Sequence, residues 1–249
     1  MTQESTEEKI RQLKEWTDAS DNIVFFGGAG VSTESGIPDF RSVDGLYHQK
    51  YDVPPETILS HTYYRARTKE FFRFYWDKMI YPDAKPNAAH LKLAEWERQG
   101  KCRAVVTQNI DGLHQAAGSK NVLELHGSVL RNTCERCRKT YTLEELAEVK
   151  NPDGIPICTC GGTIKPDVVL YEEGLDQRTI EDAVRYIRNA DILIIGGTSL
   201  AVYPAAGLID YYGGDKLVLV NKSETPRDRE ANLAIHASIG EVFSHILLD

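Results

Sequence analysis

Short apolar runs alternate with longer helical patterns along most of this chain, and this alternation limits its possible folds more than any other feature. Most of the runs are continuous, which suits parallel strands covered on both faces. The runs are residues 22–26, 103–108, 122–127, 167–171, 191–197 and 216–221. Helical patterns such as 87–100 and 178–191 lie between several of them. The sequence therefore predicts an α/β fold with a Rossmann-like, doubly wound parallel sheet.

Two segments interrupt the alternation. Residues 42–86 are rich in aromatic and charged side chains, with helical spacing in 63–79, and residues 131–165 hold four of the five cysteines. We interpret them as a helical insertion and a zinc module that together form a smaller domain. The larger Rossmann-like domain is then built from residues 1–41, 87–130 and 166–249. A cleft between the two domains is the expected site.

Composition and charge narrow the function classes. The net charge of −8 over 249 residues argues against a dedicated nucleic-acid binder, whose affinity rests on Lys and Arg. The N-terminal stretch has no apolar core of a secretory signal, and no apolar run approaches the ~18 residues of a membrane span. We therefore expect a cytoplasmic protein without membrane binding. Ser5 and Glu8 fit a capping box at the start of a first helix.

Four cysteines form two close pairs, Cys134-x2-Cys137 and Cys158-x-Cys160. In a reducing compartment such pairs favour a metal over disulfides, and four thiolates complete a tetrahedral structural zinc site. The alternative is four unrelated free thiols. The second pair is tighter than the usual two-residue gap. The remaining Cys102 is expected to be a buried thiol in a strand.

A glycine-rich loop, GGAGVSTESGIPDFR (27–41), follows the first predicted strand. Gly28 and Gly30 match the first two glycines of a dinucleotide-binding fingerprint, but Thr33 replaces the third. No second strand follows until about residue 103, so an ordinary dehydrogenase half is disfavoured. The loop predicts a turn that cradles phosphate and leads into a helix. By itself it is a weak signal, since tight turns use glycine without any ligand.

Polar residues follow three further predicted strands. The stretch TQNIDGLH (107–114) carries Gln108, Asn109, Asp111 and His114, ELHGS (124–128) carries His126, and GGTSLAVYP (196–204) carries Gly197-Thr198-Ser199. In open α/β sheets, ligands bind at the carboxyl ends of the strands. A lone histidine is more often structural than catalytic, but three polar clusters at three strand ends favour a ligand site. In the glycine loop, Asp39 and Arg41 could pair with each other or with ligand phosphates.

These stretches together resemble the sirtuin family over roughly residues 20 to 240. The matching pieces, in the family's order, are GAGVSTESGIPDFR, KPNAAH, TQNIDGLHQAAG, LELHGS, the paired cysteines, KPDVVLYEE, GTSLAVYPAAGL and LVNKSE. The resemblance implies a bacterial-type NAD-dependent protein-lysine deacetylase with NAD as co-substrate and one structural zinc. Its partners would be acetyl-lysine proteins or peptides, bound in the interdomain cleft. The expected products are nicotinamide, O-acetyl-ADP-ribose and the deacetylated lysine.

The resemblance also implies residue roles. After nicotinamide leaves, the substrate amide oxygen attacks the ribose carbon, and His126 is the general base for a ribose hydroxyl. Asn109 would orient ribose or water, and Phe40 would shield the reactive carbon. The implied NAD-binding residues are Gly28, Ala29, Gly30, Thr33, Asp39, Phe40, Arg41, Gln108, Asn109, Ile110, Asp111, His126, Gly197, Thr198, Ser199, Asn221 and Lys222. The implied walls of the acyl-lysine tunnel are Phe40, His126, Val168, Val169 and Leu170.

The chain departs from the family at several positions. Gly27 stands where Thr is common, and Glu172 stands where Gly is usual. Members that prefer succinyl groups carry a Tyr and an Arg where this chain has Phe72 and Tyr75, so we expect acetyl to be preferred. Two alternatives stay open within the same chemistry, a protein ADP-ribosyltransferase and a deacylase for another acyl group. An NAD-dependent oxidoreductase and a non-catalytic, nucleic-acid-binding zinc module are disfavoured rivals.

Overall fold

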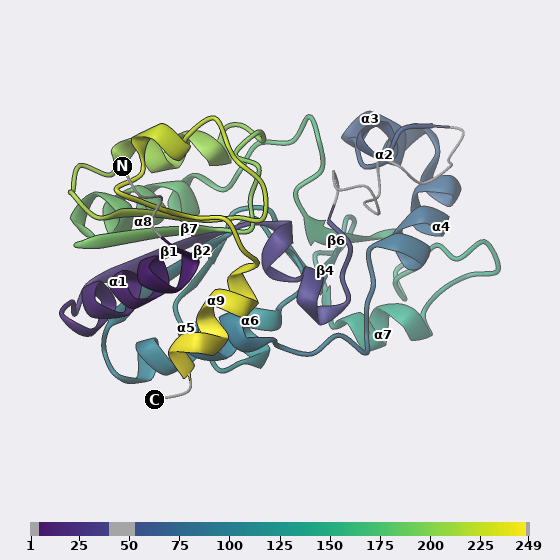
Figure 1. The fold of residues 1–249 in the computed structure, drawn as a ribbon. Helices are drawn as coiled ribbons and strands as arrows, with labels where there is room; N and C mark the ends of the chain where they lie inside the picture. The colour runs from purple at the N-terminus through teal and green to yellow at the C-terminus, as the bar shows by residue number, and fades with distance from the viewer. Residues whose placement is uncertain (1–4, 40–52, 248–249) are drawn as a thin grey trace.

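The computed structural model describes residues 5–39 and 53–247 of the chain. Figure 1 shows a larger body that carries a sheet flanked by helices, joined to a smaller body with its own sheet. Both described ends of the chain lie on the larger body. Among the helices in the described ranges, none is long and apolar enough to cross a membrane.

The larger sheet has six strands in the order β3-β2-β1-β7-β8-β9, and all neighbouring pairs are parallel. The strands are β1 (Ile23–Gly27), β2 (Cys102–Thr107), β3 (Val122–Glu124), β7 (Ile192–Gly196), β8 (Leu217–Val220) and β9 (Leu233–Ile235). The chain adds β2 and β3 on one side of β1 and later adds β7 to β9 on the other. The strand order therefore reverses between β1 and β7, where open α/β sheets bind ligands.

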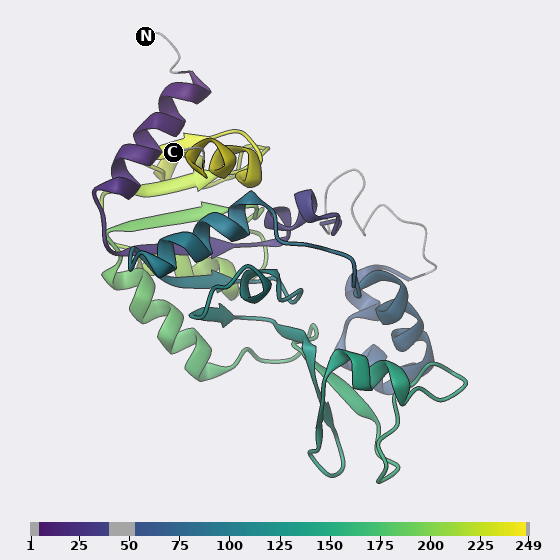
Figure 2. The ribbon, with the colours of Figure 1, turned by 90° about the horizontal axis from the view of Figure 1, so that it is seen from below.

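Helices cover both faces of this sheet, as Figure 2 also shows. Alternate β1 side chains face opposite layers, so Phe25 packs with Leu13 and Trp96 while Phe26 packs with Ile187. One layer contains α1 (Thr6–Asp18), α5 (Ala88–Arg98) and α9 (Ile239–Leu247), and the other contains α8 (Gln177–Asn189) and the 3₁₀ helix η4 (Ala205–Tyr211). Burial on both faces explains why the strands are continuously apolar, and the predicted doubly wound fold is confirmed.

The smaller body combines an antiparallel sheet with short helices. Its strands are β4 (Gly127–Cys134), β5 (Thr140–Tyr141) and β6 (Ile164–Val168), in the order β5-β4-β6. Its helices are α2 (Pro55–Ile58), α3 (His61–Ala66), α4 (Thr68–Lys78) and α7 (Leu143–Glu148). One apolar core joins them, with Phe71 and Phe72 of α4 packed with Ile164 and Val168 of β6. The exact residues at which we place the domain boundaries stay a prediction.

Two predictions about strands were wrong. The run 167–171 does not join the larger sheet, because β6 lies in the smaller one and ends at Val168. Its buried Ile164, Pro166 and Val168 alternate with half-buried residues, as expected of a strand with one covered face. The sixth strand of the larger sheet is β9, whose three residues are too few to give a clear apolar run.

The prediction of a helix after the glycine loop was also wrong. Two 3₁₀ turns follow β1 instead, η1 (Ala29–Val31) and η2 (Thr33–Ser35). Gly36 has a φ of +86°, which ends the second turn in the left-handed region that favours glycine. The predicted helical segment 63–79 divides at Arg67 into α3 and α4. The capping box of Ser5 and Glu8 is confirmed at α1.

Candidate active site

The carboxyl ends of three central strands meet at one edge of the larger sheet. Gly27 at the end of β1 is in register with Thr107 of β2 on one side and with Gly196 of β7 on the other. Backbone hydrogen bonds connect the first residues of the loops that follow these strands. The Gln108 amide donates to the Gly27 carbonyl (3.0 Å), and the Gly28 amide donates to the Gly196 carbonyl (3.2 Å). The structure thus brings the predicted polar clusters together.

The glycines of the first loop allow close contact between backbones. The Gly30 amide donates to the Gly197 carbonyl at 2.8 Å, and a Cβ at Gly30 would lie 2.8 Å from the Gly197 Cα. A Cβ at Gly28 would lie 2.8 Å from the Thr198 Cβ. Both distances are too short for a side chain, so the loops after β1 and β7 need glycine simply to pack. The Thr33 hydroxyl donates back to the Gly30 carbonyl at 3.0 Å and closes the turn.

A buried serine links the glycine loop to the loop after β2. The Ser32 hydroxyl donates to Asp111 Oδ2 at 2.6 Å and accepts from Asn109 Nδ2 at 3.1 Å. The other Asp111 oxygen accepts from the Leu113 amide at 2.9 Å, so the carboxylate orientation is fixed. Ser32 is only 1% exposed. Sequence reasoning did not select Ser32, because a serine inside a glycine-rich loop gives no signal that separates it from an ordinary turn residue.

The loops after β2, β7 and β8 converge on Thr198. Gln108 Nε2 donates to Thr198 Oγ1 at 3.2 Å, and Asn221 Nδ2 donates to the Thr198 carbonyl at 2.7 Å. The neighbouring Ser199 and Lys222 are exposed at the same edge. Amide and hydroxyl groups of this kind suit ribose and phosphate oxygens.

His126 occupies the turn between β3 and β4, where the two bodies join. Its Nδ1 lies 3.0 Å from the Gln108 carbonyl oxygen. Because a carbonyl only accepts, Nδ1 carries the proton and Nε2 of the neutral ring is the proton acceptor. Burial lowers the pKa of His126, although the hydrogen bond to Gln108 opposes that shift. The geometry and the lowered pKa both favour a neutral imidazole that can act as a base.

The predicted tunnel residues lie beside His126. The Val169 amide donates to the His126 carbonyl at 2.9 Å, and Val168 and Leu170 are 9% and 4% exposed. Ile110 is tied to the start of the smaller body, because its carbonyl accepts from the Val129 amide at 3.0 Å. Asp39 is half-buried at the end of the first described range. Phe40 and Arg41 lie outside the described residues.

His114, from the predicted cluster after β2, belongs to the core rather than to the edge of the sheet. It is 1% exposed, and its ring centroid lies 4.8 Å from that of the fully buried His90. Burial lowers the pKa of His114 to about 3 and that of His90 to about 4. Both rings are therefore neutral parts of the packing behind Asp111 at neutral pH.

The four clustered cysteines of the smaller body lie close enough together to hold one metal ion. Their Sγ atoms all lie within 4.8 Å of one another, and the Cys134–Cys160 and Cys137–Cys158 pairs are each 3.5 Å apart. Sulfurs around a tetrahedral zinc are separated by about 3.8 Å, so the cluster fits that ion. Four sulfur ligands would complete the coordination of a tetrahedral zinc and leave no position for water, which suits a structural rather than a catalytic ion.

Cys102 is not part of this cluster. It is 4% exposed in β2, and burial raises the pKa of its thiol to about 12. The prediction of a buried thiol in a strand is confirmed.

The sequence and the fold both match known proteins. The model of the Sir2 family matches residues 28–204. An NAD-dependent protein deacetylase of Clostridium acetobutylicum is 59% identical over 243 residues, covering 96% of this chain and 98% of that protein. Proteins with the same name from Clostridium perfringens and Staphylococcus aureus are 58% and 43% identical, covering 97% and 96% of this chain and 99% and 98% of those proteins.

Solved structures agree with the sequence matches. A structure described as "Sir2-p53 peptide-NAD+" superposes with a TM-score of 0.84 at 39% identity, covering 96% of this chain and 97% of that one. Another, "Sir2 bound to acetylated peptide", gives a TM-score of 0.85 at 38% identity with the same coverage. Since the family model spans more than half of the chain and the relatives nearly all of it, this protein belongs to the Sir2 family, the sirtuins.

Proposed function

We propose that this chain is an NAD-dependent protein deacetylase that transfers the acetyl group of a modified lysine to ADP-ribose. One observation carries the proposal: His126 is held as a neutral base where the strand-end loops of the larger sheet meet the Val168–Leu170 segment of the smaller body. The names of the close relatives support the same activity. The products would be nicotinamide, O-acetyl-ADP-ribose and the protein with its lysine side chain deacetylated.

The residues at the sheet edge fit NAD as a co-substrate. NAD would supply an ADP-ribosyl group activated by its nicotinamide leaving group. Thr198 and Ser199 would contact the phosphates, together with the glycine loop around Gly30. Asn109 and Asp111 would hold ribose hydroxyls or nicotinamide through side chains that Ser32 keeps in place. The remaining proposed contacts are Gly28, Ala29, Thr33, Asp39, Gln108, Ile110 and Gly197, with Asn221 and Lys222 at the adenosine end.

His126 would act as the general base. Its Nε2 would take a proton from a ribose hydroxyl, while the bond from Nδ1 to the Gln108 carbonyl fixes the tautomer and the ring plane. A neutral ring is needed for this role, and the lowered pKa of His126 keeps the ring neutral at pH 7. Val168, Val169 and Leu170 would form an apolar wall for the acyl-lysine chain.

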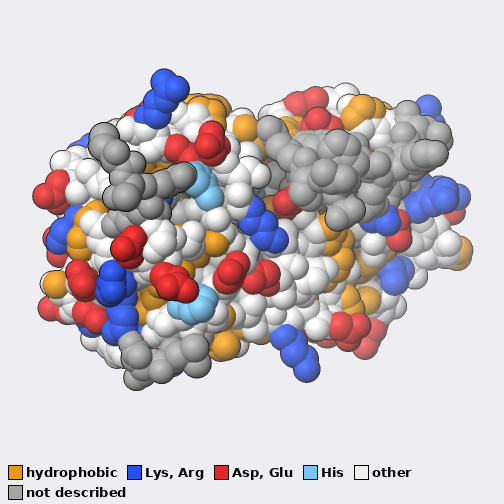
Figure 3. All heavy atoms as spheres, viewed as in Figure 1, with side chains coloured by type: hydrophobic (Ala, Val, Ile, Leu, Met, Phe, Trp, Pro, Cys, Tyr) orange, Lys and Arg blue, Asp and Glu red, His pale blue; other side chains and the backbone are white. Residues whose placement is uncertain are grey.

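An acetylated protein or peptide is the proposed partner, as in the Sir2 structures described with acetylated peptides. Nucleic acid is a poor alternative. The chain carries a net charge of −8. On the face in Figure 3, Lys and Arg side chains of the described residues are interspersed with Asp and Glu rather than gathered in a stripe. We place the reaction in the cytoplasm, where thiols such as those of the zinc cluster stay reduced.

Acetyl is proposed as the preferred acyl group over succinyl. Phe72 and Tyr75 of α4 are 0% and 1% exposed and belong to the core of the smaller body. Neither side chain offers a positive charge for the succinyl carboxylate, and burying an unpaired carboxylate is costly.

Mass spectrometry of matched acetyl and succinyl peptides, incubated with and without NAD, tests this proposal. We expect NAD-dependent loss of the acetyl group, with one O-acetyl-ADP-ribose formed for each lysine side chain deacetylated. Removal of the succinyl group should be much slower. NAD consumption with an intact acetyl peptide would refute deacetylation and favour ADP-ribosyl transfer. Equal rates on the two peptides would refute the acyl preference alone.

A further inference from the structure

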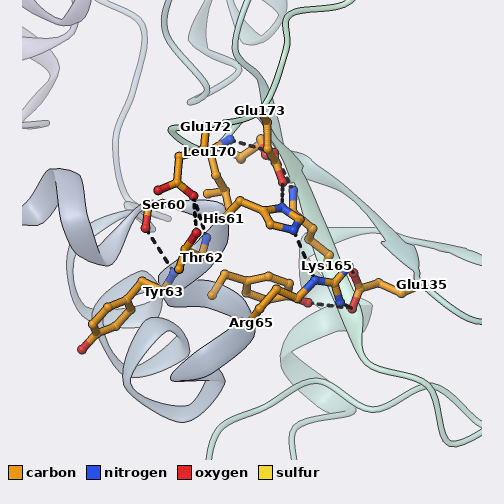
Figure 4. A network of polar contacts seen from close by, with 12 residues as sticks. Ser60, His61, Thr62, Tyr63, Arg65, Glu135, Lys165, Leu170, Glu172 and Glu173 are labelled. Carbon is orange, nitrogen blue, oxygen red and sulfur yellow. Dashed lines mark hydrogen bonds and ion pairs between the residues drawn. The ribbon is translucent and has the colours of Figure 1, made fainter.

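The start of α3 is joined to the segment that directly follows the proposed acyl-lysine wall. Ser60 and Tyr171 form an isolated parallel bridge. The Tyr171 amide donates to the Leu59 carbonyl and the His61 amide to the Tyr171 carbonyl, both at 3.0 Å. Figure 4 shows the polar side chains around this contact, among them those of His61, Glu172 and Glu173. We call residues 59–62 and 171–173 the module junction, because it ties the helical segment to the strand β6 side of the smaller body.

Glu172 completes the junction by capping α3 from outside the helix. Its Oε2 accepts from the Thr62 amide at 2.9 Å and from the Thr62 hydroxyl at 2.7 Å (Figure 4). The next amide of the helix, that of Tyr63, donates to the hydroxyl of the N-cap residue Ser60 at 3.1 Å. A negative charge at the start of a helix also interacts favourably with the helix dipole. Tyr171 and Glu172, which lie outside the helix, therefore accept from two of its first three amides.

The backbone of Glu172 has a left-handed conformation, which the contacts of the module junction hold in place. Glu172 has a φ of +75°, in the left-handed region that is costly for any residue with a Cβ. Such a conformation persists only where surrounding contacts hold it. Hydrogen bonds from the Thr62 hydroxyl and amide lower the pKa of Glu172, so the cap stays ionised at neutral pH.

The adjacent Glu173 extends the junction into the proposed wall. Its Oε1 lies 2.8 Å from His61 Nδ1, and its Oε2 accepts from the Leu170 amide at 2.9 Å. Oε2 also accepts from Lys165 Nζ at 3.2 Å, and that ammonium donates to the Val168 carbonyl at 3.0 Å. Both ends of the Val168–Leu170 segment are thus connected to the start of α3.

Side chains on the two sides of the junction share one small cavity. Leu59, Phe71 and Tyr75 line it from the helical segment, and Val168 and Leu170 line it from the wall. A shift of α3 at the junction would change the shape of the space behind the wall, because packed side chains transmit displacement.

We propose that Glu172 is a positioning residue for the acyl-lysine substrate, which holds the helical segment against the Val168–Leu170 wall. This inference rests on the proposed function, because that function makes the wall a substrate surface. The proposed NAD contacts lie on loops of the larger sheet. Loss of the Glu172 contact should therefore weaken peptide binding and leave NAD binding and the chemical step nearly unchanged.

Steady-state kinetics and peptide binding of three variants test the inference. In Glu172→Ala we expect the KM for an acetyl-lysine peptide to rise about fivefold, with kcat and the KM for NAD within about twofold of the parent values. Glu172→Gln keeps an oxygen that accepts from Thr62, so its peptide KM should return to within about twofold of the parent. Glu70→Ala is the matched control, because Glu70 is an exposed carboxylate that pairs with Arg67 inside the helical segment.

Fluorescence anisotropy of a labelled acetyl peptide gives a second readout that needs no turnover. Weaker binding by Glu172→Ala, restored in Glu172→Gln, would support the positioning role even if the parent enzyme removed no acetyl group, and the proposed function alone would then fail. Unchanged peptide affinity in Glu172→Ala would overturn the inference, as would an equal loss in Glu70→Ala or equal losses for peptide and NAD. A parent protein that binds no acetyl peptide would overturn both proposals.

Discussion

The imidazole of His126 is held by the backbone of Gln108, with 3.0 Å between His126 Nδ1 and the carbonyl oxygen. This contact joins the turn after β3 to the loop after β2 and assigns the proton of the neutral ring to Nδ1. The ring therefore offers Nε2 as its only basic atom.

The pH dependence of the reaction should follow the lowered pKa of His126. Burial lowers the pKa of His126 from the ordinary 6.5, so the neutral base already predominates at pH 6.5 and is lost as the pH falls further. We expect the acid limb of kcat/KM for an acetyl peptide to titrate with an apparent pKa below 6.5. Initial rates between pH 5 and pH 8, under conditions that keep NAD intact, check this. An acid limb above pH 6.5 would contradict the assignment.

Ser32→Ala should impair the use of NAD more than it affects folding. The change removes the donor to Asp111 and the acceptor for Asn109, so both side chains lose the partner that fixes them. We expect kcat/KM for NAD to fall about tenfold. Ser244→Ala is the control, since this hydroxyl bonds a carbonyl within α9 away from the sheet edge. An unchanged kcat/KM for NAD would show that Asn109 and Asp111 keep their positions without Ser32.

Removal of zinc should destabilise the smaller body. Cys134 and Cys158 are 0% and 3% exposed within the core that also contains α4 and β6. We expect one zinc per chain by elemental analysis, its loss in Cys134→Ala, and a fall in Tm on the order of 10 °C. Cys102→Ala removes a thiol outside the cluster and should retain the metal. Full zinc content in Cys134→Ala would refute the assignment of the site.

The buried histidine pair should make stability depend on pH. The pKa of His114 is lowered to about 3 in the folded chain, whereas the unfolded chain binds a proton near 6.5. The contribution of His114 is therefore complete above about pH 6.5 and is lost as the pH falls. Neither ring nitrogen of His114 has a hydrogen-bond partner among the described residues, so Phe is a suitable replacement.

Urea unfolding at pH 7.5 and pH 5 measures this effect. Between these values His114→Phe should lose about 2 kcal/mol less unfolding free energy than the parent protein. Equal losses in the two proteins would show that His114 does not titrate differently in the folded and unfolded chains.

The larger sheet could be predicted because its signal is local. Phe25 and Phe26 are both fully buried, one in each layer, so β1 reads as a continuous apolar run. The gathering of the four cysteines could also be predicted, since two close thiol pairs indicate one cluster with little help from the rest of the chain. The strand β9 was missed because three residues carry too little pattern.

The contacts that organise the site could not be predicted, because they join distant residues with no shared pattern. Ser32 and Asp111 are 79 positions apart, and Thr62 and Glu172 are 110 positions apart. Only the folded chain shows that the unusual residue at position 172 caps a helix. Likewise, the sequence grouped His114 with the site, whereas packing places it in the core.

The most direct test compares the parent protein with His126→Ala on one acetyl-lysine peptide, with NAD present and absent, by mass spectrometry of peptide and nucleotide products. The account predicts NAD-dependent deacetylation with equal amounts of O-acetyl-ADP-ribose in the parent, and a rate lower by about 10²-fold or more in the variant. The variant should keep the Tm of the parent within a few degrees. Deacetylation at the parent rate by His126→Ala, or without NAD, would contradict the central claim.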